Sequence, residues 1–253
     1  MREKLIALSI IKKGNWDEIY QFLRTDRQLN SIDDVAARQF VDQLNHDVVT
    51  LIDADYPAAW HEMSKPPFVV YLKGNRQLLS AEVLGIVGGK EMNEYTKKVL
   101  ENLMLQLPKN VSIVTGLERG VEAFVNYYRK NRIVCLGAGF EADEFYHKQP
   151  IYHQLNADDL LMTELPPQAN FDMKAYYRSY HLMSEMSQLV GVFGLASFDL
   201  RLKYLNYLTE IGKPVVVLPD RASQSTAGGL DLLNRGAKCL VQVSEVLDLL
   251  ALE

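Results

Sequence analysis

Three apolar segments of the sequence end directly in glycine, and this combination of residues can bind an anion. The segments are IVGGK at 86–90, IVTGLERG at 113–120 and CLGAG at 135–139. Where a buried strand turns into a helix, glycine lets backbone N–H groups at the helix N-terminus approach a phosphate. The same glycines could instead serve only to permit tight turns, and the pattern leaves both interpretations open.

The glycine segments match neither of two common nucleotide-binding motifs. Ala142 stands where the dinucleotide fingerprint G-x-G-x-x-G, begun at Gly137 and Gly139, requires its third glycine. No segment has the spacing of a P-loop, in which G-K-[ST] follows a first glycine and four intervening residues. We therefore expect no cofactor such as NAD or ATP.

Carboxylates near the glycine segments are the other groups that could do chemistry. Glu118 and Glu122 are four residues apart, and Glu164 ends the apolar run DLLMTE. Paired carboxylates can act as general acid and base, but glutamates that are solvated or paired with arginine are the favoured interpretation. The histidines lack metal-ligand spacing, and no serine lies in a G-x-S-x-G elbow. We expect neither a catalytic residue nor a metal.

Residues 171–187, FDMKAYYRSYHLMSEMS, interleave cations with aromatic rings. Single-stranded nucleic acid is bound in this way, since rings stack on bases and cations contact phosphates. The cations are Lys174, Arg178 and His181. The alternative is a helix whose tyrosines pack on a sheet and whose cations face water.

Composition restricts where nucleic acid could bind. The formal net charge of the 253 residues is −5, so any phosphate site must be a local patch rather than the whole surface.

The apolar runs are too short to span a bilayer, and the basic N-terminus is read as an amphipathic helix rather than a signal peptide. Cys135 and Cys239 lack C-x-x-C spacing, which predicts buried free thiols in a reducing cytoplasm.

The arrangement of apolar runs predicts the elements that position these residues. Residues 1–50 are expected to form two or three short helices, as a small N-terminal helical appendage to one domain over 51–253. From Val48 onward the sequence changes to short apolar strands, most of them separated by segments with helical spacing. This alternation predicts an α/β fold with a doubly wound, mostly parallel, Rossmann-like sheet.

Several of these segments together resemble the DNA-processing protein A family, also called DprA or Smf. The resemblance runs from about residue 48 to 250 through DADYP at 53–57, PPFVVYLKGN at 66–75, IVG at 86–88, TGLERGVE at 115–122, TELP at 163–166 and LLNRGA at 232–237. Lys90 replaces the family arginine after I-V-G, and Glu118 replaces the alanine before Arg119. The segment YYRSYH at 176–181 stands where the family has F-P-x-R-N-R and lacks both of its arginines.

The resemblance implies a cytoplasmic, dimer-forming protein that binds single-stranded DNA and helps load the recombinase RecA during natural transformation. It also implies a DNA-phosphate pocket made by Gly88, Gly89, Lys90, Gly116, Arg119, Gly120, Gly137 and Gly139, and extended by Lys174, Arg178 and His181. The given sequence stops at the helix after KCLVQV, which predicts no winged-helix extension.

Two other functions stay open. Related Rossmann-like enzymes hydrolyse nucleoside monophosphates, but their P-G-G-x-G-T signature has no counterpart in VFGLASFD at 192–199. The third alternative is a decayed pocket that senses a nucleotide or binds a protein, favoured by Glu118 and by the altered arginine motif.

Overall fold

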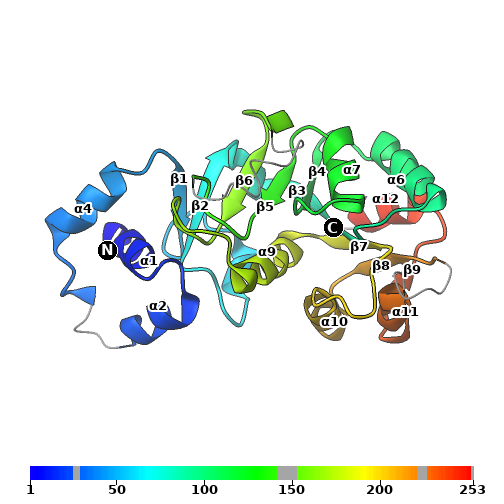
Figure 1. The fold of residues 1–253 in the computed structure, drawn as a ribbon. Coiled ribbons are helices and arrows are strands. Elements are labelled where there is room, and N and C mark those ends of the chain that lie inside the picture. The colour runs from blue at the N-terminus through cyan, green and yellow to red at the C-terminus, as the bar shows by residue number, and fades with distance from the viewer. Residues whose placement is uncertain (25–28, 142–152, 221–226, 252–253) are drawn as a thin grey trace.

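A computed structural model describes residues 1–24, 29–141, 153–220 and 227–251. It contains a nine-stranded sheet with helices on both faces (Figure 1). The strands are β1 (Asp47–Thr50), β2 (Val69–Gly74), β3 (Glu82–Gly88), β4 (Val111–Thr115), β5 (Ile133–Cys135), β6 (Leu160–Thr163), β7 (Leu189–Phe193), β8 (Val215–Leu218) and β9 (Lys238–Cys239). The helices are α1 (Arg2–Ile11), α2 (Trp16–Leu23), α4 (Asp34–Asp42), α5 (Ala58–His61), the 3-10 helix η1 (Arg76–Ser80), α6 (Glu94–Gln106), α7 (Val121–Tyr128), α9 (Met173–Met186), α10 (Leu202–Glu210), α11 (Ala227–Asn234) and α12 (Val243–Ala251).

The strand order is β1-β2-β6-β5-β4-β3-β7-β8-β9. The pairs from β6 through β9 are all parallel, whereas β2 is antiparallel to both β1 and β6. From β3 the chain first builds outward through β4, β5 and β6, and then returns to the other side of β3 to add β7, β8 and β9. The prediction of a doubly wound, mostly parallel sheet is confirmed. The reversal at β3 is the position where such sheets open a crevice at their carboxyl edge.

Two apolar layers bury the sheet, because its central strands are apolar on both faces. On one face Tyr180 and Met183 of α9 and Leu205 of α10 pack against residues such as Val87 and Val114. On the other face α6, α7 and α12 contribute Leu103, Val125 and Val246, among others, to a second cluster with Ile86 and Ile113. Both clusters are almost fully buried.

The N-terminal helices pack on the sheet. Leu5, Ile6 and Leu8 of α1 share a third apolar cluster with Val69 and Tyr71 of β2. The Tyr71 hydroxyl donates to Ser9 Oγ at 3.1 Å, so this face of α1 is bonded to the strand as well as packed on it. The α1 and α2 helices thus cover the part of the sheet that α6 and α7 leave open (Figure 1).

The cysteines differ from expectation at one of the two positions. Cys135 is buried, and burial raises the pKa of its thiol. Cys239 is exposed, because β9 has only two residues and lies at the edge of the sheet. The prediction of two buried thiols was therefore wrong at Cys239. Among the helices that the structure describes, none combines the length and apolarity needed to span a membrane.

Candidate nucleic-acid interface

A cavity of about 760 Å³ opens where the strand order reverses, at the carboxyl ends of β3, β4 and β7. We call it the switch-point pocket. Its lining comes from the turns after these strands and from the start of α9, and consists of Gly89, Lys90, Glu91, Glu118, Arg119, Phe171, Met173, Tyr176, Tyr177, Gly194, Ala196, Phe198, Asp199, Leu200 and Arg201. The volume is within the usual range for a small-molecule site, roughly 300–1,000 Å³.

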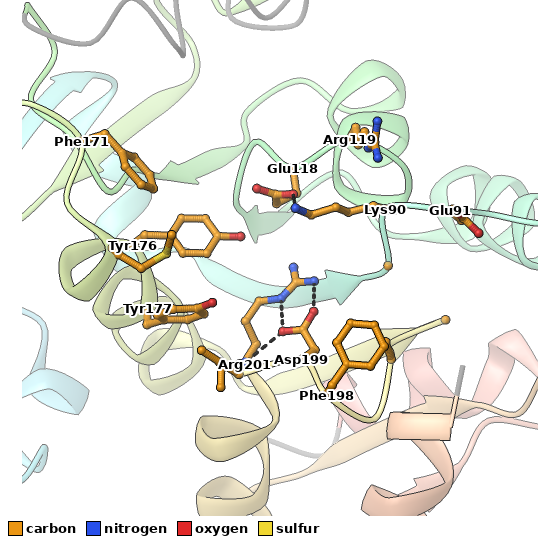
Figure 2. A pocket seen from close by; sticks show the side chains of 15 residues that line it. Lys90, Glu91, Glu118, Arg119, Phe171, Tyr176, Tyr177, Phe198, Asp199 and Arg201 are labelled. Carbon is orange, nitrogen blue, oxygen red and sulfur yellow. Dashed lines mark hydrogen bonds and ion pairs between the residues drawn. The ribbon is translucent and has the colours of Figure 1, made fainter. Parts of the chain in front are cut away.

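Two cations, Lys90 and Arg119, and two acids, Glu91 and Glu118, lie on the side of the pocket formed by the β3 and β4 turns (Figure 2). Lys90 Nζ is 3.1 Å from Glu118 Oε2, and the lysine side chain is 57% exposed while the glutamate is 14% exposed. Arg119 is exposed and has no hydrogen bond or ion pair to any described residue. An anion entering here would meet a free guanidinium and an ammonium that is already paired.

Aromatic rings form the other walls. Phe171, Tyr176 and Tyr177 line the side toward α9, and Phe198 lies across from them (Figure 2). The Tyr176 ring is edge-on to that of Tyr177, with centroids 5.1 Å apart. Phe198 is 77% exposed and Phe171 is 37% exposed, so both rings are accessible to a ligand. Such rings offer faces on which a planar base can stack.

A buried ionic network supports the pocket from beneath. Arg201 donates to Glu122 Oε1 at 2.6 Å, to Asp199 Oδ2 at 2.7 Å and to the carbonyl oxygen of Gly88 at 3.0 Å. The Tyr180 hydroxyl donates to Glu122 Oε2 at 2.8 Å. Arg201 therefore ties the end of β3, the start of α7 and the turn after β7 together.

Burial and charge act in opposite directions on this network. Burial raises the pKa of Glu122, and the Arg201 charge and the Tyr180 hydrogen bond counteract it. Burial also works to lower the pKa of Arg201, but the hydrogen bonds to Asp199 and the charge of Glu122 outweigh it and raise that pKa. Glu122 accepts from Arg201, Tyr180 and the Glu118 N–H, and these three donors favour the charged form of its carboxylate. The expectation of arginine-paired glutamates is met here, and again at Glu164 with Arg178.

The glycine turns bring some of the predicted residues together. Gly120 has φ +84°, and its backbone lies against Gly89 and Lys90 so closely that no side chain would fit between them. The Val121 N–H donates to the Gly89 carbonyl at 3.1 Å. These contacts place Gly88, Gly89, Lys90, Arg119 and Gly120 at one edge of the sheet.

Of the glycines that the resemblance placed in the pocket, only Gly89 lines it, and Gly116, Gly137 and Gly139 each have a backbone group that is already bonded. Gly116 lies against Glu122 and the Tyr180 hydroxyl, and its carbonyl accepts from Asn126 Nδ2 at 2.9 Å. Gly139 donates its N–H to the Ala169 carbonyl at 2.9 Å, and Gly137 accepts from the Asp172 N–H at 3.0 Å. Gly89 likewise donates its N–H to the Phe193 carbonyl. At these positions glycine allows close packing of the turns.

The predicted cations of residues 171–187 lie away from the switch-point pocket. Lys174 and Arg178 face a different cavity, and Arg178 Nη2 forms an ion pair with Glu164 Oε2 at 2.5 Å. His181 is buried, stacked on Tyr204 at 5.3 Å, with Nε2 3.3 Å from Glu185 Oε1. The structure thus separates Lys174, Arg178 and His181 from Lys90 and Arg119.

Phe198, Asp199 and Arg201 are pocket residues that the sequence analysis did not select. Their position in the sequence could have identified them. They follow the apolar strand at 189–193, just as the glycine turns follow the strands before them. Among the described residues, no group of three His, Cys, Asp or Glu side chains is placed to hold a metal ion.

Comparison with known proteins agrees with this architecture. A sequence model of the family described as DNA recombination-mediator protein A matches residues 47–251. Protein Smf of Synechocystis is 24% identical over 215 residues, which cover 81% of this chain and 54% of that protein. The chain therefore spans about half the length of this relative.

Two solved structures share the fold. That of DNA processing protein A (DprA) from Streptococcus pneumoniae has a TM-score of 0.78 at 17% identity, covering 96% of this chain and 97% of that one. That of DNA processing protein A from Helicobacter pylori has a TM-score of 0.72 at 19% identity, covering 82% and 97%. The Helicobacter structure is described as giving insight into a unique single-stranded DNA binding mode.

Proposed function

The chain belongs to the DNA recombination-mediator protein A family, and on this basis we propose that it binds single-stranded DNA in the switch-point pocket. The proposal treats the chain as a mediator that holds DNA rather than as an enzyme that changes it. The observation that carries the proposal is the pairing of exposed rings with cations in one cavity, Phe171 and Phe198 with Arg119 and Lys90. A single strand needs both, stacking for its bases and charge for its phosphates.

Most carboxylates of the site are engaged in a way that supports a binding role. Glu118, Glu122 and Asp199 are each in an ion pair, with Lys90 or with Arg201, whereas Glu91 is exposed and has no ion pair with a described residue. A general base needs a carboxylate that is free to take a proton from its substrate. Glu122 is fully buried beneath the pocket, where it fixes Arg201 and Tyr180.

The family relationship extends the proposal beyond the pocket. We propose that the protein acts in the cytoplasm as a homodimer and passes bound DNA to the recombinase RecA during natural transformation. The names of the Streptococcus and Helicobacter proteins, which describe DNA processing, support the DNA part of this role.

The test is fluorescence anisotropy of labelled oligo-dT over a salt series, with the wild type and a Lys90→Ala/Arg119→Ala variant. Micromolar or tighter binding is expected, weakening with salt in proportion to the number of phosphates contacted. The variant should bind more weakly and with a smaller salt dependence. Lys109→Ala/Lys130→Ala is the matched control, because both lysines are exposed and precede β4 and β5, at the opposite edge of the sheet.

Absence of binding at low salt would contradict the proposal. Release of a free base from nucleoside monophosphates would instead identify a hydrolase. Binding of a mononucleotide but not of oligo-dT would identify a nucleotide sensor.

A further inference from the structure

A second cavity of about 1150 Å³ lies beside the switch-point pocket and shares Phe171 with it. We call it the N-terminal groove. It is bounded by the turn between α1 and α2, by Lys65, by the segment 164–172 and by Lys174 and Arg178 of α9. We infer that a single strand bound in the switch-point pocket continues past Phe171 into this groove, where its phosphates contact Lys13 and Lys174. The inference rests on the proposed function and extends the binding site to a second region.

The charges in the groove leave two cations unpaired. Asp17 pairs with Lys65 at 2.6 Å, Glu18 with Lys12 at 3.6 Å, and Glu164 with Arg178 at 2.5 Å. The fourth acid, Asp172, accepts from the Ala175 N–H at 2.8 Å and so caps α9.

Lys13 and Lys174 are exposed, and neither has an ion pair with any residue in the described ranges. Together with Arg119 they give the two adjoining cavities three unpaired cations. Unpaired cations at the rim of a groove are what a phosphate backbone requires.

The turn that carries Lys13 is fixed against the rest of the protein. Gly14 lies against the carbonyl of Glu164, and its N–H donates to the Ser9 carbonyl at 2.9 Å. Lys13 is therefore presented over the groove by a turn packed on the segment after β6. Lys174 is on the opposite border, in the first turn of α9.

Apart from Phe171, which the groove shares with the switch-point pocket, its one aromatic lining residue in the described part of the chain is Trp16, and this ring is not free to stack on a base. The Trp16 ring is stacked on Tyr20 at 4.9 Å and on Phe68 at 5.3 Å, with Lys65 Nζ 4.8 Å from its centroid. Its Nε1 donates to the Pro66 carbonyl at 2.7 Å. Beyond Phe171 the groove therefore offers charge rather than stacking, which makes its contribution dependent on salt and independent of base identity.

The test compares a short labelled oligo-dT of about five nucleotides with a long one of about twenty, over a salt series. Charge reversal in a Lys13→Glu/Lys174→Glu variant should weaken binding of the long strand about tenfold or more and leave the short strand unaffected. The salt slope for the long strand should fall by about 1.4, at about 0.7 for each lost contact. Lys13→Gln/Lys174→Gln, which only neutralises the lysines, should give the same slope change with a smaller loss of affinity.

The matched control is Lys109→Glu/Lys130→Glu, which changes net charge equally at the far edge of the sheet. An equal loss of affinity in the control would overturn the inference, because charge alone would explain the effect. Unchanged affinity of the lysine variants for the long strand would also overturn it, while wild-type binding of both strands would leave the proposed function standing. If the wild type binds neither strand, the proposed function itself fails.

Discussion

Lys90 and Glu118 form an ion pair within the switch-point pocket, with 3.1 Å between Nζ and Oε2. In this pair the Lys90 ammonium, which a DNA phosphate would contact, is already bound to Glu118. Glu118 also carries a negative charge that repels the phosphate. DNA must displace or reorganise this pair in order to use Lys90.

Replacing Glu118 with glutamine should therefore tighten DNA binding. We expect affinity for oligo-dT to rise about three- to tenfold and the salt slope to increase by about 0.7, the value for one added phosphate contact. The measurement is the anisotropy titration described above. Glu210→Gln makes the same charge change at an exposed position at the end of α10 and should leave affinity nearly unchanged. Equal affinity of Glu118→Gln and wild type would show that the pair does not limit DNA binding.

Loss of Arg201 should destabilise the protein strongly. The Arg201 side chain is 3% exposed and the Glu122 side chain is 0% exposed, so Arg201→Met leaves a buried carboxylate without its cation. Breaking a buried pair from one side costs roughly 3–5 kcal/mol. Urea denaturation should show a loss of this size, and adding Glu122→Gln should recover part of it because the remaining buried group is then neutral.

The control for Arg201 is Arg235→Met. Arg235 and Asp231 form an exposed pair four residues apart on α11 and in the turn after it, with side chains 49% and 46% exposed. An exposed pair of this kind contributes about 0–1 kcal/mol, so the stability should hardly change. A similar small loss for Arg201→Met would mean that the network contributes little to stability.

The sequence was sufficient to predict the strands because their apolar runs are nearly continuous. The burial of the short strand at 238–239 could not be predicted in the same way. Side chains of an edge strand can stay exposed to solvent, and Cys239 does so. The contact between Arg201 and Glu122 joins residues 79 positions apart. Such a pair leaves no local spacing pattern, and only the folded arrangement of α7 and the β7 turn brings it together.

Helix geometry explains why the cations of residues 171–187 lie apart from the rings of the switch-point pocket. Lys174, Arg178 and His181 are spaced by four and three residues, so they share one face of α9. Tyr176 and Tyr180 share a different face, since two residues of helix turn a side chain by about 200°. Rings and cations interleaved in sequence are thus separated in space, with Tyr176 in the switch-point pocket and Lys174 in the N-terminal groove.

Asp199 should make part of the stability dependent on pH. Burial works to raise its pKa, but the hydrogen bonds and charge of Arg201 outweigh it and hold the pKa below the usual 3.8. A lowered carboxyl pKa stabilises the folded state above the unfolded value of about 3.9, and this contribution is lost as pH falls through the folded value. The free energy of unfolding of the wild type should therefore exceed that of Asp199→Asn at pH 7.

This difference should shrink below about pH 4, as measured by urea unfolding at a series of pH values. Asp231→Asn, in the exposed pair on α11, is the control and should show little difference from wild type at either pH. A wild-type advantage over Asp199→Asn that stays constant down to the acid transition would contradict the assigned role of the Asp199–Arg201 pair.

A substitution at Gly139, in the turn after β5, should change both the packing of that turn and the affinity for DNA. A Cβ atom at this position would collide with the carbonyl oxygens of Pro166 and Pro167, two residues of the segment that leads to Phe171. Gly139→Ala must push that segment away, which should cost about 1–3 kcal/mol of stability and shift Phe171 from its place between the two cavities. Affinity for long oligo-dT should fall together with the stability.

Gly212→Ala separates the two effects, because Gly212 has φ +79°, has open space where a Cβ would stand, and lines neither cavity. That substitution should cost about 1–2 kcal/mol from backbone strain and leave DNA affinity unchanged. If Gly139→Ala lowers stability but binds oligo-dT like the wild type, the position of Phe171 does not control the path of the strand.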